Sequence, residues 1–489
     1  MGIRFSDERN RAALSRATQA GSLRRVSRGV YTDDFDLTDE QVVERYRWDV
    51  VAHFVPDAVV VDRSAAGGGA PADGVLFVAS ESRTTDVKLP GLVLAVRPGV
   101  RLPSDMPLRH GVALASPART LVDNLALARG RTRAARTLSR VELGDWVARQ
   151  ASLMGRDRLN RVRDQAKSVA DQLGVPERIP QIDALVSAAL GTGDAPTKSR
   201  ALVARSAGQG FDKDRLRAFD ALSASLAILQ PDDEVPGWIE TDETTESSQG
   251  FWEAYFSNYI EGTVFEVAEA RQIVDTGQPP VDRPADGHDI LGTYRVVTDA
   301  ATRGRIADDP DQLCRLIKAL HSEILAGRPE ILPGEFKRSA NQASGYRFVE
   351  PGLVEGTLQE GFGFRQRIDN PFTRALYMFF LVSEVHPFSG GNGRVARAVM
   401  NAELTAAGQS RIVIPIVWRN EYLTSVRELS RSDRFHLYVR TLGFAWRWTA
   451  AMNWTDPPTT ELQLEQTNAL LDSTEAAGTG QRLLLPGAG

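Results

Sequence analysis

Apolar residues follow two different patterns along the chain, and these patterns divide it into regions. Residues 51–130 contain short β-branched runs such as AVVVDR and GLVLAVRPG, separated by turn residues as strands are. Residues 1–50, 131–230 and 251–452 instead carry apolar positions at helical spacing between polar ones. The pattern predicts a mainly α-helical protein with one small α/β domain near its N-terminus.

Two segments depart from both patterns. Residues 231–250, PDDEVPGWIETDETTESSQG, are acidic and rich in turn residues, which indicates a linker. Residues 453–489 end in Gly, Pro and Ala, and we expect a flexible tail there. The expected organisation is therefore a polar N-terminal region (1–50), the α/β domain (51–130), a helical connector (131–230), the linker, a second helical domain (251–452) and the tail.

The charge balance limits the classes of partner. The 489 residues hold 58 Lys and Arg against 63 Asp and Glu, a net charge of −5, so binding of nucleic acid needs a local basic patch. Cys314 is the single cysteine, which excludes an internal disulfide and agrees with a cytoplasmic protein. No apolar run approaches the ~18 residues of a membrane span, so no membrane partner is expected.

The segment HPFSGGNGRVAR, from His386 to Arg397, carries the chemistry. The apolar stretch before it predicts a buried helix, which Pro387 ends because proline disfavours helix in the preceding residue. The glycines of GGNG leave main-chain N–H groups accessible, and a second helix then begins. The first N–H groups of a helix have no partner and its dipole favours negative charge, so this loop predicts an anion site.

Three side chains add to this anion site. Arg394 and Arg397 are three residues apart on the predicted helix, and both can form paired hydrogen bonds with phosphate oxygens. His386 precedes the glycines, and its imidazole has a pKa suited to accepting a proton from a hydroxyl group. A phosphate cradle beside one base predicts phosphoryl or nucleotidyl transfer.

These residues resemble the motif of the Fic family, HPF-x-(D/E)-G-N-(G/K)-R-x-x-R. The similarity extends to PGEFKRSANQASGYRFVEP (333–351) and NEYLTSV (420–426), and it covers roughly 250–450. The resemblance implies a helical domain with a short β-hairpin, the flap, over the site. The activity that it implies is transfer of AMP from the substrate ATP to a Ser, Thr or Tyr hydroxyl of a protein target.

The resemblance also implies a role for each motif residue. His386 would deprotonate the target hydroxyl. Arg394 and Arg397 would hold the outer phosphates of ATP. The nucleotide phosphates would also be held, through main-chain N–H groups and the Asn amide, by Gly391, Asn392 and Gly393.

One position departs from the family motif. The acidic residue that binds the Mg²⁺ or Mn²⁺ bridging the phosphates is Gly390 in this chain. A glycine has no side-chain ligand, while phosphoryl transfer depends strongly on such a cation. Three interpretations stay open: the metal is held by the nucleotide, water and another acid; a different group is transferred; or the site binds nucleotide and turns over poorly.

A second motif of the family lies upstream. Residues 251–276 predict one helix, on which Ser257 and Glu261 share a face. SNYIEG matches the inhibitory pattern of one Fic subgroup. Gly262 inside the helix predicts close approach to another backbone, because glycine there costs roughly 1 kcal/mol. The resemblance implies that Glu261 pairs with Arg397 and occupies the outer-phosphate position; the alternative is a solvated Glu on an amphipathic helix.

The flap also has two interpretations. NQASG, between FKRSA and YRFVE, is rich in turn residues and predicts a hairpin. A surface hairpin without a function would show the same pattern. The resemblance implies instead an exposed edge to which a target segment adds as a strand, at Gly345, Tyr346, Arg347 and Phe348.

The first 31 residues form a local basic patch. ERNRAALSRATQAG predicts a helix, and GSLRRVSRGVY predicts a wing of two short strands that carries Arg24, Arg25 and Arg28. A helix with a basic wing is suited to the duplex DNA backbone. LRRVSRGVY, VVDRSAA and ASPARTLVDNLA together resemble the AbiE-type antitoxin, a winged-helix repressor with a following α/β domain. Alternatively, the basic face packs on the acidic run TDDFDLTDE.

These observations predict a self-inhibited Fic nucleotidyltransferase with an antitoxin-like regulatory N-terminal half. The expected partners are a protein hydroxyl and duplex DNA. Two alternatives remain open. One is a catalytically weak nucleotide sensor in a DNA-binding transcriptional regulator. The other is a toxin–antitoxin fusion in which the N-terminal half restrains the C-terminal half.

Overall fold

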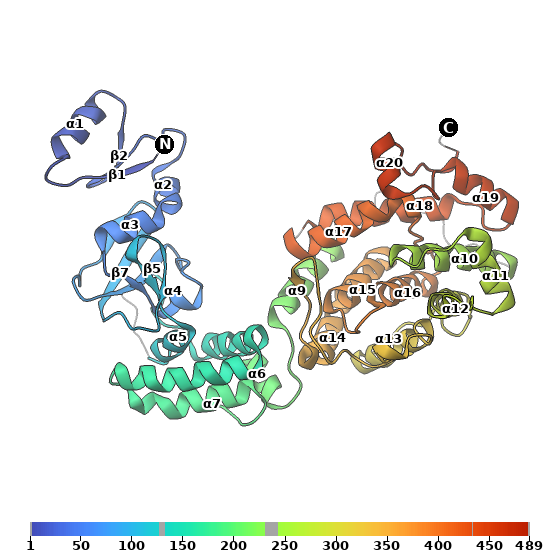
Figure 1. Cartoon of the computed structure of the whole chain (residues 1–489), viewed down its shortest axis with the longest axis horizontal. Helices are drawn as coiled ribbons and strands as arrows, with labels where there is room; N and C mark the ends of the chain where they lie inside the picture. The colour runs from blue at the N-terminus through green and yellow to red at the C-terminus, as the bar shows by residue number, and fades with distance from the viewer. Residues whose placement is uncertain (1, 127–132, 230–242, 433, 488–489) are drawn as a thin grey trace. The chain divides into compact units, whose positions relative to one another are not determined.

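The computed structural model describes residues 2–126, 133–229, 243–432 and 434–487 (Figure 1). The chain forms two compact units, Met1–Gly208 and Gln209–Gly489. Helices predominate and small sheets occur in the N-terminal unit, so the mainly helical fold class is confirmed. None of the described helices combines the length and the apolar character needed to cross a membrane.

The N-terminal unit begins with a three-stranded antiparallel sheet of order β1-β3-β2. The helices and strands of this first part of the unit are β1 (Ile3–Phe5), α1 (Arg11–Gln19), β2 (Arg24–Ser27), β3 (Val30–Thr32), α2 (Asp39–Arg45) and α3 (Arg47–Phe54). The expected helix and two strands are present, and β1 is an additional strand. DNA binding by this region stays a prediction.

A six-stranded mixed sheet of order β6-β7-β5-β4-β9-β8 follows. The strands of this sheet and the helices between and after them are β4 (Val59–Val60), α4 (Asp62–Ala66), β5 (Val75–Ser80), β6 (Val87–Leu89), β7 (Leu92–Pro98), β8 (Met106–Pro107), β9 (Ala113–Leu114) and α5 (Pro117–Asn124). Strand β5 is buried along its whole length. Val26 and Val30 of the first sheet lie in one hydrophobic cluster with Leu76 and Val78 of β5. The two sheets therefore share a core, and the boundary expected near residue 50 does not separate two cores.

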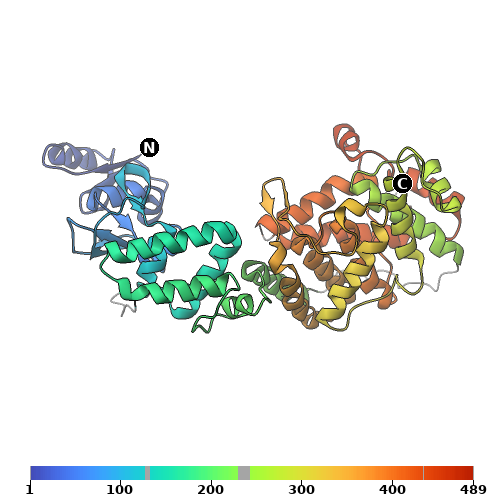
Figure 2. The ribbon, with the colours of Figure 1, turned by 60° about the horizontal axis from the view of Figure 1, so that its bottom comes forward.

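The helical connector predicted over 131–230 is divided between the two units. Its helices are α6 (Arg140–Gln172), α7 (Ile179–Ala189), α8 (Arg200–Ser206) and α9 (Lys213–Ala227). Helices α6 and α7 lie side by side in the N-terminal unit (Figures 1 and 2). Helix α9 belongs to the C-terminal unit, because its Phe219 is fully buried and packs edge-on against Tyr377 and Phe380.

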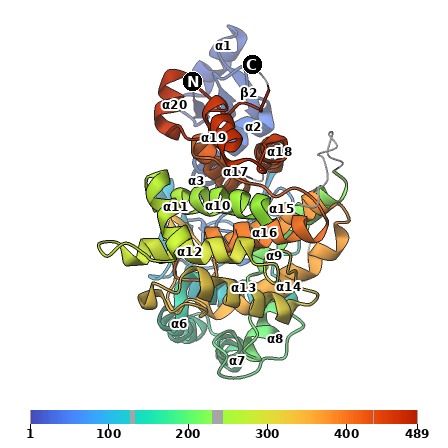
Figure 3. The same cartoon turned by 90° about the vertical axis from the view of Figure 1, so that its right-hand side faces the viewer.

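Helices α15 and α16 lie at the centre of the C-terminal unit (Figure 1). The helices and strands of this unit after α9 are α10 (Glu243–Ile260), α11 (Val267–Thr276), α12 (Pro284–Thr298), α13 (Pro310–Ile324), β10 (Gln342–Ala343), β11 (Tyr346–Arg347), α14 (Val354–Phe362), α15 (Pro371–Val385), α16 (Asn392–Ala406), α17 (Arg419–Ser432), α18 (Phe435–Ala451), α19 (Pro457–Gln466) and α20 (Ser473–Thr479). Helices α10, α12 and α13 follow one another across the unit (Figure 3). Helix α15 is buried on nearly every face, as its apolar sequence predicts. Cys314 lies in the hydrophobic core of the same unit.

The prediction of a single helix over 251–276 is wrong. Helix α10 ends at Ile260, and α11 begins at Val267. Gly262 lies in the turn between them with a φ of 94°, and a Cβ at this position would meet no atom within 4 Å. Gly262 is therefore needed for a backbone conformation that L residues rarely adopt, and not for close approach to another backbone.

The expected linker and tail also differ from the structure. Part of the predicted linker, 231–242, lies outside the described residues, but the rest of it is helical because α10 begins at Glu243. The predicted flexible tail contains α19 and α20. Leu464 and Leu483 are buried in a cluster with Trp448, and this apolar burial holds a segment whose Gly and Pro content suggested disorder.

Candidate active site

The loop between α15 and α16 contains the residues that the sequence singled out. His386, which follows α15, adopts a left-handed conformation with φ 52° and ψ 60°, uncommon for a residue other than glycine. Phe388 anchors the loop: it is fully buried, and its ring stacks on His321 with centroids 3.9 Å apart. Gly391 has a φ of 72°, and a Cβ there would lie 2.6 Å from Leu325 Cδ2, so both backbone and packing require glycine.

The Asn392 side chain braces this loop. Its carboxamide accepts a hydrogen bond from Phe388 N–H (2.8 Å) and donates to Phe388 O (2.9 Å). Both polar atoms are thus engaged within the loop, whereas the resemblance implied a contact between this amide and a phosphate. The first turn of a helix leaves its N–H groups without main-chain partners, and no side chain of the described residues caps α16. These N–H groups are what the loop offers to an anion.

His321 of α13 holds the loop, and no motif of the sequence marks it for this role. Its Nδ1 accepts from Gly334 N–H (2.9 Å), and its Nε2 lies 3.1 Å from Gly390 O. Because a carbonyl oxygen only accepts, the proton of the neutral imidazole is on Nε2. Burial lowers the pKa of His321 to about 4, so this neutral form, and with it the position of the Gly390 carbonyl, is stable at neutral pH.

His386 is oriented as a proton acceptor. Its Nδ1 lies 3.2 Å from Ser383 O, so the proton of the neutral ring is on Nδ1 and Nε2 carries the lone pair. Burial lowers the pKa of His386 to about 4, against the opposing effect of the hydrogen bond to Ser383. The imidazole is therefore neutral at pH 7 and able to take a proton from a hydroxyl group.

The β10–β11 hairpin places an aromatic ring on this base. Ser344 and Gly345 turn the chain with φ values of 48° and 78°, as in a type I′ turn, and the hairpin projects from the unit (Figure 2). The Phe348 ring, just after β11, stacks on the His386 imidazole with centroids 3.8 Å apart. The hairpin thus covers one face of the base.

The hairpin is anchored by residues outside the motif. Tyr346 Oη donates to the buried Glu384 of α15 and accepts from Arg215 Nη1 of α9 (2.6 Å). Arg215 Nη2 also donates to Arg347 O (2.6 Å), and Nη1 lies 3.0 Å from Glu384 Oε1. Burial raises the pKa of Glu384 although Arg215 opposes this effect. Helix α9 therefore fixes the flap, a role that no sequence pattern indicated for Arg215.

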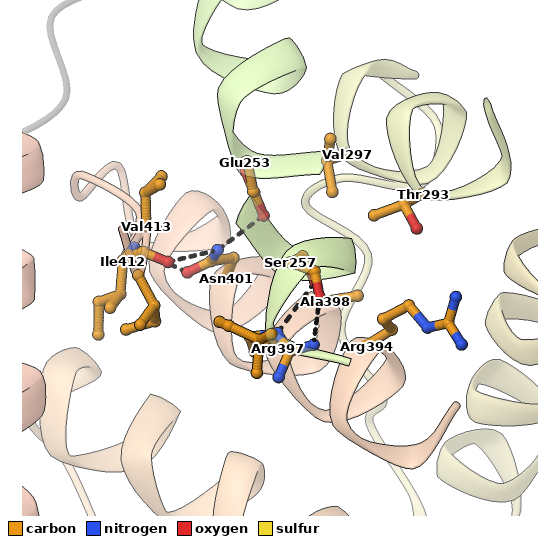
Figure 4. A pocket seen from close by; sticks show the side chains of 12 residues that line it. Glu253, Ser257, Thr293, Val297, Arg394, Arg397, Ala398, Asn401, Ile412 and Val413 are labelled. Atoms are coloured by element: carbon orange, nitrogen blue, oxygen red, sulfur yellow. Dashed lines mark hydrogen bonds between the residues drawn. The ribbon is translucent and has the colours of Figure 1, made fainter. Parts of the chain in front are cut away.

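Arg397 is held by the C-terminal end of α10 and the following turn. Its Nε donates to Ser257 Oγ (2.9 Å), and its Nη2 donates to Ser257 O (2.9 Å) and Glu261 Oε1 (2.8 Å). Its Nη1 lies 3.2 Å from the Tyr422 hydroxyl. Figure 4 shows Arg397 directed at Ser257. Only 6% of the Arg397 side chain is exposed, so losing its partners would leave a buried charge uncompensated.

The Glu261 carboxylate lies at the start of α16. A Cβ built at Gly393 would be 2.2 Å from Glu261 Oε1, so the carboxylate rests on the main chain of the first turn. Burial tends to raise the pKa of Glu261, but the guanidinium groups of Arg397 and Arg394 hold that pKa below its ordinary value. A negative group of the chain itself thus occupies the place where the sequence predicts an external anion.

Arg394, one turn earlier on α16, extends in another direction (Figure 4). Its Nη1 contacts Asp289 Oδ2 (2.6 Å) and donates to Asn258 Oδ1 (3.0 Å). The cavity that remains between α10, α12 and α16 beside these arginines measures about 10 Å³, which holds at most about one water molecule. The two arginines are therefore packed into place before any ligand binds.

The site offers a metal ion no set of protein ligands. Position 390 has no side chain, and the carboxylates of Glu261 and Asp289 are paired with Arg397 and Arg394. Within 2–126, 133–229, 243–432 and 434–487, no group of three or more His, Cys, Asp or Glu could hold a metal. The residues present do not fit a resident Mg²⁺ or Mn²⁺.

The arginines of the N-terminal patch divide into two kinds. Arg24 Nε donates to Asp34 O (3.0 Å), and its guanidinium is paired with Asp39. Both acids belong to the acidic run, as the alternative interpretation expects. Arg25 and Arg28 are exposed at the hairpin of β2 and β3.

Comparison with known proteins finds relatives of this chain. Residues 313–404 match the Fic/DOC family. The chain is 26% identical over 236 residues to "Protein adenylyltransferase Fic" of Drosophila yakuba, covering 46% of this chain and 45% of that protein. It is 27% identical over 188 residues to the protein of the same name from Aedes aegypti, covering 37% of each. The chain thus spans less than half the length of these curated relatives.

Solved structures give a more distant likeness. Fic-1 from C. elegans is similar with 16% sequence identity and a TM-score of 0.36, covering 64% of this chain and 96% of that chain. A Fic domain-containing signalling protein from Bacteroides thetaiotaomicron has 20% identity and a TM-score of 0.34, covering 56% of this chain and 99% of that chain.

Proposed function

We propose that the C-terminal unit transfers AMP, or another nucleotidyl group, from a nucleoside triphosphate to a Ser, Thr or Tyr hydroxyl of a protein. We propose further that the turn after α10 inhibits this transfer. The observation that carries both proposals is the Glu261 carboxylate, held by Arg397 against Gly393 at the start of α16. A helix start beside two arginines suits several negative oxygens, so Glu261 is an internal competitor of the nucleotide. The relatives named adenylyltransferase support the choice of AMP.

The reaction follows from the positions of the side chains once Glu261 has moved away. The outer phosphates of the nucleotide bind Arg397 and the first N–H groups of α16, in place of the carboxylate. His386 Nε2 takes the proton of the target hydroxyl, whose oxygen forms a bond to the α-phosphorus. The bond from the α-phosphorus to the oxygen bridging the β-phosphate breaks, and pyrophosphate leaves. The flap, with Phe348 on the imidazole, holds the target segment so that its hydroxyl faces His386.

The position of a radioactive label in ATP tests the reaction class. In the Glu261→Gly chain, we expect label from the α-phosphate of ATP to appear on protein, and label from the γ-phosphate to leave with pyrophosphate. Transfer of the γ-label instead would show phosphoryl transfer and contradict the proposal. Binding of ATP without transfer of either label would support the alternative, a nucleotide sensor.

Gly390→Asp should make the transfer more dependent on a divalent cation. The space is available, because a Cβ at Gly390 would meet only Ile331 Cδ1, at 3.8 Å. A carboxylate beside the phosphates adds a ligand for Mg²⁺ and its charge neutralisation. We expect added Mg²⁺ to stimulate the variant about tenfold more than the parent chain. Gly390→Ala is the matched control, because it adds a Cβ without a ligand; equal stimulation of the Asp and Ala variants would exclude a metal at this position.

A further inference from the structure

We infer that Asp289 is a positioning residue for the nucleotide: it holds Arg394 through Nη1 so that the Nε side of the guanidinium faces the outer phosphates. This assignment rests on the proposed function and adds to it a residue of α12 that no motif of the sequence marks. Arg394 would then bind phosphate as a group fixed in advance, and not as a flexible side chain.

The Asp289 carboxylate is itself fixed. Its side chain is fully buried, and Oδ2 accepts from Arg328 Nε (2.8 Å) while it contacts Arg394 Nη1 (2.6 Å). Arg328 is held in turn by Asp286, whose Oδ1 accepts from its Nη2 (2.6 Å). The two carboxylates of Asp286 and Asp289 thus balance the two guanidinium groups, and this network keeps the Asp289 carboxylate in position beside Arg394.

Asn258 is the second fixed acceptor of Arg394 Nη1. Its Oδ1 accepts from Nη1 at 3.0 Å, and its Nδ2 donates to Ala254 O (2.9 Å) and to Thr293 Oγ1 (3.1 Å). The carboxamide of Asn258 is therefore held by α10 and α12. Asp289 and Asn258 together determine the direction of Nη1 and so the plane of the guanidinium.

The Nε side of the Arg394 guanidinium lacks a hydrogen-bond acceptor among the residues that the structure describes. Nε is buried, and only 7% of the side chain is exposed. Buried donors are nearly always paired, because an unpaired one is destabilising. Arginine binds phosphate oxygens through pairs of neighbouring N–H groups. A phosphate at the start of α16 is therefore the ligand that would give Nε a hydrogen-bond acceptor.

Asp289 differs in this respect from the inhibitory Glu261. Glu261 follows the end of α10, and 26% of its side chain is exposed, so it can leave. Asp289 has no exposed side-chain surface, lies within α12 and is tied to Arg328. The first acid competes with the nucleotide, whereas the second stays in place when the nucleotide binds.

The test measures nucleotide affinity by calorimetry in the Glu261→Gly background. Asp289→Asn should weaken ATP and ADP about tenfold, since a misplaced charge-assisted hydrogen bond costs about that much. AMP, which lacks the outer phosphates, should keep its affinity within about twofold of the parent. Asp275→Asn is the matched control: it makes the same Asp-to-Asn change at an exposed position of α11, outside the network of Arg328 and Arg394. It should leave all three affinities unchanged.

Each outcome decides one claim. Unchanged or tighter binding of ATP by Asp289→Asn would overturn the assignment, and tighter binding would make Asp289 a second competitor. If thermal melting shows that Asp289→Asn is unfolded, Asn258→Ala removes the other Nη1 acceptor without leaving a charge unpaired. That variant should lose ATP affinity relative to AMP, and an equal effect on both would overturn the assignment. A Glu261→Gly parent that binds no ATP contradicts the proposed function itself, whereas a binding parent with unaffected variants contradicts only the role of Asp289.

Discussion

Glu261→Gly should increase transfer of label from α-labelled ATP to protein by about tenfold or more, the size expected when a bound internal competitor is removed. The carboxylate of Glu261 lies on the first turn of α16 and is paired with Arg397. As long as it stays there, the outer phosphates have neither the arginine nor the space over Gly393. Removing the carboxylate makes Arg397 and the space over Gly393 available to the phosphates, while Ser257 and Tyr422 keep Arg397 in place.

The control for this variant is Glu266→Gly. Glu266 lies in the same connection between α10 and α11, is exposed, and makes no side-chain hydrogen bond to the first turn of α11. It should leave the labelling unchanged. Equal labelling of the parent chain and Glu261→Gly would show that Glu261 is not an inhibitor.

His386→Ala should reduce the transfer about 100-fold or more when it is made in the Glu261→Gly background, the usual contribution of a general base. His386 Nε2 carries the lone pair that can accept a proton, because Nδ1 donates to Ser383 O. Burial holds the pKa of His386 at about 4, so the imidazole is a neutral acceptor at pH 7. Affinity for ATP should stay close to that of the parent, because the proposed contacts of the phosphates are the arginines and the helix start and not His386.

A histidine of the same unit provides the comparison. His436 lies exposed on α18, and His436→Ala should leave both labelling and affinity unchanged. If the His386→Ala variant labels as fast as its parent, His386 is not the base. A loss of ATP affinity that equals the loss of labelling would assign His386 to binding alone.

The loop between α15 and α16 could be predicted from the sequence because residues that are neighbours in the chain indicate it. Pro387 ends a helix, the glycines permit the turn, and Arg394 and Arg397 follow within one helical turn. These neighbouring residues indicate where the turn lies, although its final geometry also depends on the contacts with His321 of α13. The pair of Glu261 and Arg397 joins residues 136 positions apart, and only the SNYIEG pattern indicated it, through the resemblance.

The residues that hold the site in place could not be predicted. His321, Asp289 and Arg215 are single polar residues of α13, α12 and α9, with no motif around them, and only the packing of these helices brings them to the site. The helical period also continues through Val264, which predicted a longer α10. That residue is in fact 51% exposed, because Gly262 had already ended the helix through its backbone conformation.

The most direct measurement is the intact mass of the Glu261→Gly chain after incubation with a mixture of nucleoside triphosphates. We expect a gain equal to one nucleoside monophosphate, located on a Ser, Thr or Tyr, and no gain in the Glu261→Gly, His386→Ala double variant. An unchanged mass, a gain of phosphate alone, or a nucleotidyl gain that survives the loss of His386 would show that the C-terminal unit does not transfer a nucleotidyl group in the proposed way.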